Sequence, residues 1–240
     1  MSQGANAAPK EPQSATERTL TPASDQTVKQ VPVEVKKAVV FFIGGAADKE
    51  SYYFQGPNNN VADAQILLDA HFQLERQSGT YESHHLGYSD VRGSWDIDSD
   101  VKSKIASKAM PVYLIGHSLG GWNGAHLAEI LTDDGYNVEV LVTLDPVGKG
   151  LLVWLGSDIY MSEPTPKAKF WINIRADAKQ PDSSDNVAEF GERWVPKGAN
   201  VSAVADINHL YADRLFKVML PQGLSALEYV KQSIREYLAK

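Results

Sequence analysis

Cysteine is absent from the 240 residues of this chain. Its absence excludes disulfide bonds, thiolate zinc sites and cysteine nucleophiles. Basic residues are also in the minority, with 23 Lys and Arg against 30 Asp and Glu and a formal net charge of −7. A chain with that balance has no basic surface to neutralise phosphates, so we expect no nucleic-acid partner.

Long apolar runs are missing as well. No segment of the sequence approaches the roughly 18 consecutive apolar residues of a membrane-spanning helix. The N-terminal stretch MSQGANAAPKEPQSATERTL contains no apolar core of the kind found in a Sec signal peptide. We therefore expect a protein that is cytoplasmic or is exported by a route that does not depend on such a signal.

The first 36 residues differ from the rest in composition. They are rich in Ala, Pro, Ser, Thr and Gln, include Pro9, Pro12, Pro22 and Pro32, and carry few large apolar side chains. Such a segment buries too little surface to offset the entropy lost when a chain becomes ordered. We predict a disordered N-terminal arm over residues 1–36, either without function or used for targeting or docking, and one folded domain over 37–240.

From residue 38 onward, short and almost wholly apolar runs alternate with segments of helical periodicity. We predict strands over 38–45, 84–89, 111–115, 137–145 and 168–177, and helices over 61–77, 99–110, 119–131 and 225–240. Ser99 is the expected N-cap of the second of these helices. Strands that are apolar on both faces are typical of a parallel sheet covered by helices on both sides. The predicted fold is therefore an α/β, doubly wound, mostly parallel sheet flanked by helices, with its active site at the carboxyl ends of the strands.

A sharp corner between a predicted strand and a predicted helix contains Gly116-His117-Ser118-Leu119-Gly120. The pattern G-x-S-x-G is informative where it follows a buried strand and opens a helix, as it does here. A serine held in a strained conformation projects its hydroxyl above the sheet, and flanking glycines let the strand and helix approach each other. Ser118 is therefore the candidate nucleophile; an ordinary tight turn is the alternative.

A serine hydroxyl needs a general base, and the chain contains six histidines. His209 falls in a loop after the last predicted strand and before the closing helix, where an imidazole can reach over the carboxyl edge of the sheet. The other five lie within the elbow, within predicted helices or at the start of a strand: His71, His84, His85, His117 and His126. We predict His209 as the base.

An acid is needed to orient that imidazole and to stabilise its charged form. Asp145 ends one apolar strand and is followed by Pro146, which stops the strand; Asp177 ends the next apolar strand. Either would give the chain order Ser, Asp, His. We favour Asp145 and keep Asp177 as the alternative acid.

Two backbone amides should complete the site by binding an oxyanion. The first is expected from Leu119, directly after the candidate nucleophile. The second is expected from the loop that follows the first strand, where Gly44 and Gly45 allow the backbone to bend; Ala46 or Gly45 would be the donor.

These segments resemble the α/β-hydrolase superfamily and, within it, its lipase-like branch. GHSLGG at 116–121 is similar to the elbow of many lipases, and TLDPVG at 143–148 resembles the strand end that carries the acid in some of them. The resemblance covers about residues 38–240 and implies a catalytic domain over 37–240, with Ser118 as nucleophile, Asp145 as acid, His209 as base and Leu119 with Ala46 as oxyanion donors. It implies no metal and no cofactor. The early loop departs from the family's usual His-Gly, which leaves the second donor open between Ala46 and Gly45. More loosely, the chain resembles bacterial lipase effectors delivered by a type VI apparatus.

The expected function is hydrolysis of carboxylic esters, of the lipase or phospholipase kind, through an acyl-enzyme. Thioesterase or amidase chemistry on the same triad, or a binding protein that keeps the fold without the activity, are the alternatives. The apolar run at 151–155 predicts a buried helix or wall or, if it is exposed near Ser118, an acyl-chain wall or interfacial lid. The polar loop over 179–194 would shape the rim of the cleft. Expected partners are a lipid or other acyl ester, a transient membrane-surface contact and, for an effector, an immunity or delivery protein.

Overall fold

The computed structural model describes residues 35–51 and 56–240, and the predicted N-terminal arm falls almost entirely outside these ranges. The described residues form a six-stranded sheet in the order β2-β1-β3-β4-β5-β6, in which every neighbouring pair is parallel. The strands are β1 (Ala38–Gly44), β2 (Tyr81–Gly87), β3 (Pro111–His117), β4 (Asn137–Leu144), β5 (Phe170–Ala176) and β6 (Val201–Ala205). The predicted doubly wound α/β fold is confirmed.

The central strands are buried on both faces because each face supports a separate apolar core. In β1, Val40 and Phe42 contribute to one core, whereas Phe41 and Ile43 contribute to the other. Side chains alternate across a strand, so a run without polar residues must be covered on both sides. This requirement explains why the sheet lies between two layers of helices.

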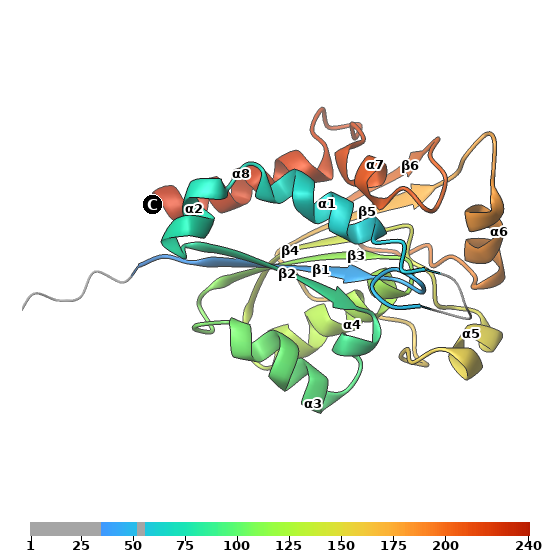
Figure 1. The fold of residues 1–240 in the computed structure, drawn as a ribbon, viewed down its shortest axis with the longest axis horizontal. Helices are drawn as coiled ribbons and strands as arrows, with labels where there is room; N and C mark the ends of the chain where they lie inside the picture. The colour runs from blue at the N-terminus through green and yellow to red at the C-terminus, as the bar shows by residue number, and fades with distance from the viewer. Residues whose placement is uncertain (1–34, 52–55) are drawn as a thin grey trace, which may run out of the picture. The chain divides into compact units, whose positions relative to one another are not determined.

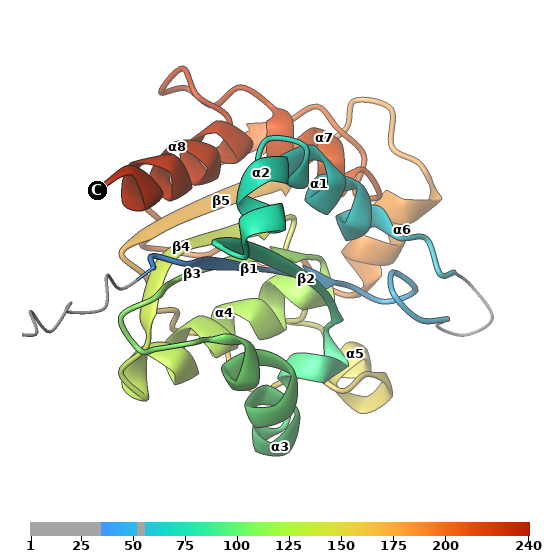
Figure 2. The same ribbon diagram turned by 60° about the vertical axis from the view of Figure 1, so that its left-hand side comes forward.

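The helices divide between these two layers, as Figures 1 and 2 show. Apolar side chains of α1 (Asn60–Asp69), α7 (Ala212–Lys217) and α8 (Ala226–Ala239) belong to the first core. Those of α4 (Leu119–Asp133) belong to the second, together with Ile97 and Val101, which follow the short α3 (Ser94–Asp96). The N-terminus of α8 is capped by the Ser225 hydroxyl, which accepts a hydrogen bond from the Glu228 amide at 3.1 Å.

Two predicted helices differ from the structure. The segment 61–77 is not one helix: α1 ends at Asp69 and α2 (Gln73–Ser78) begins after a turn at Phe72. That turn buries the Phe72 ring, which stacks on Tyr81 with ring centroids 4.8 Å apart. The helix predicted over 99–110 is instead a run of short α, π and 3-10 turns over 94–104, so Ser99 is internal and is not an N-cap.

Several other segments also differ from the predicted helices, strands and loops. The strand predicted over 84–89 is shifted and occupies Tyr81–Gly87. Within the predicted loop over 179–194 lies α6 (Ser183–Phe190), begun by a capping box between Asp182 and Asp185. The strand β6 and the helix α7 were not predicted. The apolar run at 151–155 forms α5 (Leu151–Gly156).

The register of the sheet brings distant segments to one edge. Ile43 lies opposite Gly116, and His117 lies opposite Leu144. The residues that follow β1, β3 and β4 therefore emerge close together at the carboxyl edge. Both α5 and α6 lie at that end of the sheet (Figure 1).

None of the helices in the described ranges combines the length and the apolar character that crossing a lipid bilayer requires.

We expect Gly120→Ala to destabilise the fold strongly. A Cβ atom at this position would lie 2.1 Å from the backbone oxygen of Ile43, so α4 and β1 would have to separate. The expected loss is about 3 kcal/mol or more in the free energy of unfolding, measured by urea denaturation. Gly124→Ala is the matched control, because its Cβ would meet the end of the flexible Ile43 side chain at 3.0 Å. Equal stability of the two variants would contradict this packing account.

Candidate active site

Ser118 occupies the corner between β3 and α4 in a backbone conformation that side chains rarely adopt. Its φ is 55° and its ψ is −126°. The corner is closed by backbone contact, since a Cβ on Gly116 would lie 2.3 Å from the Gly120 oxygen. Strain of this kind persists where the surrounding structure enforces it and concentrates at functional sites. The predicted elbow is therefore present in its strained form.

His209 reaches Ser118 from the loop between β6 and α7. Its Nε2 lies 3.0 Å from the Ser118 Oγ, and its Nδ1 lies 2.6 Å from the Asp145 Oδ2. When Nδ1–H donates a hydrogen bond to the carboxylate, Nε2 carries the lone pair and can accept the serine proton. The three side chains lie in one hydrogen-bonded chain, although 91 residues separate Ser118 from His209.

Asp145 directly follows β4 and is fully buried, with a φ of 42°. Its Oδ1 accepts a hydrogen bond from the Ala176 amide at 3.0 Å, and its Oδ2 also accepts one from Arg193 Nε at 2.9 Å. Burial by itself would raise the pKa of this carboxyl, but the hydrogen bond and charge of His209, followed by the Arg193 charge, lower the pKa below its ordinary value. The carboxylate is therefore ionised at neutral pH.

Asp177, the alternative acid, lies elsewhere. Its side chain is exposed and forms an ion pair with Arg175, whose Nη2 lies 3.0 Å from the Asp177 Oδ2. The structure thus brings Asp145, and not Asp177, to the imidazole.

His117 has a place in the site that the sequence did not reveal. Its Nε2 hydrogen-bonds to the backbone oxygen of His209 at 2.8 Å, and the two rings lie 4.7 Å apart between centroids. Burial, and then the neighbouring His209, lower the pKa of His117 to about 3, so its ring is neutral. The elbow therefore holds the loop that carries the base.

Two residues that line the cavity beside Ser118 have backbone amides available to a ligand. Leu119 begins α4, and the first amides of a helix have no acceptor within it. Ala46 lies in the loop after β1, and within the described ranges its amide has no acceptor. Both residues line the same cavity as Ser118. This geometry suits two donors to an oxyanion.

Gly45, the other candidate donor, is engaged differently. Its amide interacts with the carboxylate of Asp48, which is fully buried and accepts a hydrogen bond from the Val61 amide at 3.2 Å. The absence of a side chain on Gly45 is required by Ser118, because a Cβ there would lie 2.6 Å from the Ser118 Cβ. Ala46 therefore has the better-placed free amide.

The cavity beside Ser118 has a volume of about 370 Å³ and is mostly apolar. Its walls come largely from α5, α6 and the turns after them: Val147, Leu152, Val153, Gly156, Ser157, Val187, Ala188, Phe190 and Gly191. The expectation that the run at 151–155 is buried is wrong, since Leu151, Leu152 and Leu155 are exposed. The alternative of an apolar wall near Ser118 fits, because Leu152 and Val153 line the cavity.

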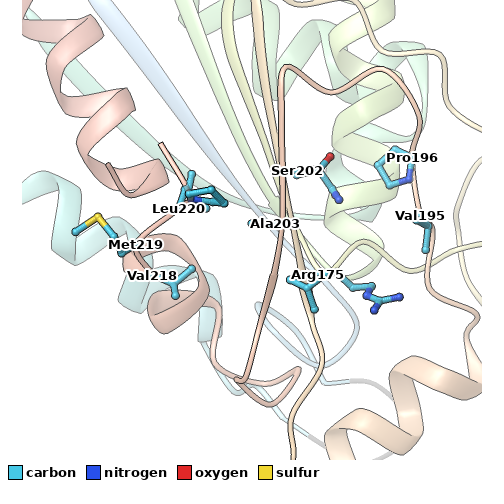
Figure 3. A pocket seen from close by; sticks show the side chains of 11 residues that line it. Arg175, Val195, Pro196, Ser202, Ala203, Val218, Met219 and Leu220 are labelled. Carbon is cyan, nitrogen blue, oxygen red and sulfur yellow. The ribbon is translucent and has the colours of Figure 1, made fainter. Parts of the chain in front are cut away.

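A larger hollow of about 650 Å³ lies along β5 and β6, and it shares no lining residue with the first. Figure 3 shows Val218, Met219 and Leu220 on one side of it and Val195 and Pro196 on the other. Its polar side chains are Asn173, Arg175 and Ser202, which do not make a pair of nucleophile and base. Among the described residues, no group of three or more His, Asp or Glu side chains is arranged to hold a metal ion.

Comparison with known proteins finds no matching family model and no matching curated protein. Several solved structures are similar at low identity. The type II thioesterase YbtT from the yersiniabactin NRPS/PKS biosynthetic pathway is 13% identical, with a TM-score of 0.44, over 85% of this chain and 94% of that one. The esterase domain of a Rhodothermus marinus protein is 13% identical, with a TM-score of 0.47, over 86% and 90% of the two chains. A hyperthermophilic esterase from the archaeon Pyrobaculum calidifontis is 13% identical, with a TM-score of 0.41, over 84% and 77%.

The buried Asp48 makes stability depend on pH. Burial raises the pKa of this carboxyl to about 6, against the smaller opposing effect of the amides of Val61, Asn60 and Gly45. A group with a raised folded-state pKa contributes stability that is complete below its unfolded value and is lost as the pH rises through the folded one. Asp48 should therefore cost the wild type about 2 kcal/mol between pH 4 and pH 7.

Asp48→Asn removes this titration. We expect the unfolding free energy of the wild type, minus that of the variant, to fall as the pH rises from 4 to 7. Urea denaturation at a series of pH values measures the difference. A difference that stays constant over this range would show that the pKa of Asp48 is the same in the folded and unfolded states, which would contradict this account.

Proposed function

We propose that this protein is a serine hydrolase that cleaves carboxylic esters through an acyl-enzyme. The observation that carries the proposal is the hydrogen-bonded chain Asp145–His209–Ser118, which ends at an apolar cavity beside the amides of Leu119 and Ala46. Nucleophile, base, acid and oxyanion donors are the four parts that acyl transfer requires.

In the first half of the reaction, His209 Nε2 takes the hydroxyl proton of Ser118 as Oγ bonds to the ester carbonyl carbon. The carbonyl oxygen becomes an oxyanion that accepts hydrogen bonds from Leu119 and Ala46. The ionised Asp145 stabilises the imidazolium that forms on His209. When the bond to the alcohol oxygen breaks, that oxygen takes the proton from Nε2 and the acyl group stays on Ser118.

In the second half, a water molecule gives its proton to His209 Nε2 and attacks the acyl carbon. The same amides hold the oxyanion. The bond between the acyl carbon and Ser118 Oγ then breaks, Oγ regains the proton and the carboxylic acid leaves. No further reactant is needed.

The cavity favours an aliphatic acyl group, and we propose a lipase- or phospholipase-like substrate. About 370 Å³ of mostly apolar space lies directly beside Ser118. The exposed side chains of Val187 and Phe190, on α6, line that space, and α5 adds the exposed Leu151 and Leu155. An exposed apolar surface at the mouth of a cleft is suited to transient contact with a lipid surface.

Replacement of the triad residues tests the reaction. Ser118→Ala should lower kcat for a short p-nitrophenyl ester by at least about 10³-fold. Asp145→Asn should lower it by about 10⁴-fold, because the amide favours the wrong imidazole tautomer. Asp177→Asn is the matched control and should keep wild-type kcat. Retained turnover in Ser118→Ala would refute the proposal, and thioester and amide substrates assayed alongside would identify a different leaving group.

Leu152 and Leu155, two of the three exposed leucines of α5, distinguish the acyl wall from the lipid-facing rim. Leu152 lines the cavity, whereas Leu155, 75% exposed, does not. Leu152→Glu should lower kcat/KM for a decanoyl ester about tenfold relative to an acetyl ester, because a charge in the wall opposes binding of the chain. Leu155→Glu should leave that ratio unchanged while lowering activity on phospholipid vesicles. An equal effect of both variants on soluble esters would contradict the assigned wall.

A further inference from the structure

Arg193 is placed beside the site by a segment distant in sequence. The residues that follow Asp145 pair with it, because Val147 and Arg193 form an antiparallel bridge and the Trp194 amide donates to the Pro146 oxygen at 2.7 Å. The Arg193 side chain is largely buried. The turn after the acid therefore fixes the position of the guanidinium.

Three carboxylates bind this guanidinium. Its Nε donates to the Asp145 Oδ2 at 2.9 Å, its Nη2 to the Asp185 Oδ1 at 3.2 Å and its Nη1 to the Glu189 Oε2 at 3.3 Å. The first contact is to the same oxygen that accepts the His209 Nδ1 hydrogen bond. Two donors thus share one oxygen of the acid.

Asp185, in the first turn of α6, holds the base as well as Arg193. Its Oδ1 also accepts the backbone amide of His209 at 3.0 Å. Its Oδ2 accepts the side-chain amide of Asn208 at 2.9 Å and the Asp182 amide at 2.9 Å. The Asp185 carboxylate therefore fixes both the loop that carries the His209 imidazole and the Arg193 guanidinium, which shares the Asp145 Oδ2 with that imidazole.

We propose that Arg193, held by Asp185, is a positioning residue that sets the working pH range of the site by sharing the Asp145 Oδ2 with His209. This inference rests on the proposed function, because it assigns a regulatory element to the same triad. Nothing in the two half-reactions above uses Arg193, yet its charge lies against the acid on which the base depends.

The charges around His209 give the direction of the effect. Asp145, at the end of β4, stabilises the imidazolium, and Asp185, on α6, adds a second negative charge near the loop. Arginine carries a positive charge in proteins, so Arg193 opposes the imidazolium. His117, at the end of β3, is neutral because burial lowers its pKa to about 3. The positive charge of Arg193 therefore opposes the charged imidazolium, whereas Asp145 and Asp185 favour it.

Replacing Arg193 and replacing Asp185 should move the midpoint of the His209 imidazole in opposite directions. A merely structural role of these residues would not produce opposite shifts. Arg193→Gln removes a positive charge and should move the NMR midpoint of the His209 imidazole upward. Asp185→Asn removes a negative charge and should move it downward. Glu189→Gln is the matched control, since the Glu189 side chain is 83% exposed and solvent screens its charge. It should leave the midpoint unchanged.

The test is an NMR titration of the His209 imidazole in the wild type and the three variants, with the pH profile of kcat/KM for a soluble ester as the second readout. We expect the acid limb of that profile to move with the NMR midpoint. The midpoint in Arg193→Lys should lie between those of the wild type and Arg193→Gln, because lysine retains the positive charge. Midpoints that do not move, or that move in the same direction in Arg193→Gln and Asp185→Asn, would overturn the proposal.

The NMR titration does not require turnover, so the inference and the proposed function can fail separately. A protein that hydrolyses no ester but shows the opposite shifts would retain the Arg193 effect and lose the proposed function. If Arg193→Gln does not fold, Asp185→Asn carries the test, and an unchanged or higher midpoint in that variant would overturn the inference.

Discussion

The buried carboxylate of Asp145 is the interaction on which the rest of the site depends. A buried charge is costly unless it is paired and hydrogen-bonded. Asp145 meets that requirement with the Ala176 amide, His209 and Arg193, which come from β5, from the loop after β6 and from the segment after α6. Satisfying this one charge therefore draws together three segments that follow it in the chain.

The helix α6 links the acid and base to the cavity. Its first turn carries Asp185, which holds the His209 loop and Arg193. Its later residues, Val187 and Phe190, line the apolar space beside Ser118. A displacement of this helix would alter the cavity wall and the support of the imidazole together. The alignment of the triad and the shape of the acyl wall are thus properties of the same element.

Local patterns predicted the parts of the site that depend on local structure. The glycines around Ser118 and the proline after Asp145 are signals of a corner and of a strand end, and the sheet register then brings both residues to one edge. Arg193 gave no such signal, because its role comes from a pairing 48 residues away in sequence. The helix α6 was not predicted because its first turn, Ser183–Asp185, is polar and is typical of a loop. In the structure a capping box between Asp182 and Asp185 begins the helix. Exposure of the α5 leucines likewise depends on which tertiary neighbours cover them, and an apolar run does not encode that information.

The most direct test of the account is covalent labelling with a fluorophosphonate, followed by mass spectrometry of the proteolytic peptides. An activated serine attacks the phosphorus and loses its proton to the base, so labelling reports the nucleophile without any assumption about the substrate. The account predicts one adduct per chain, on Ser118, and its loss in His209→Ala. An unlabelled protein, or an adduct on another serine, would contradict it.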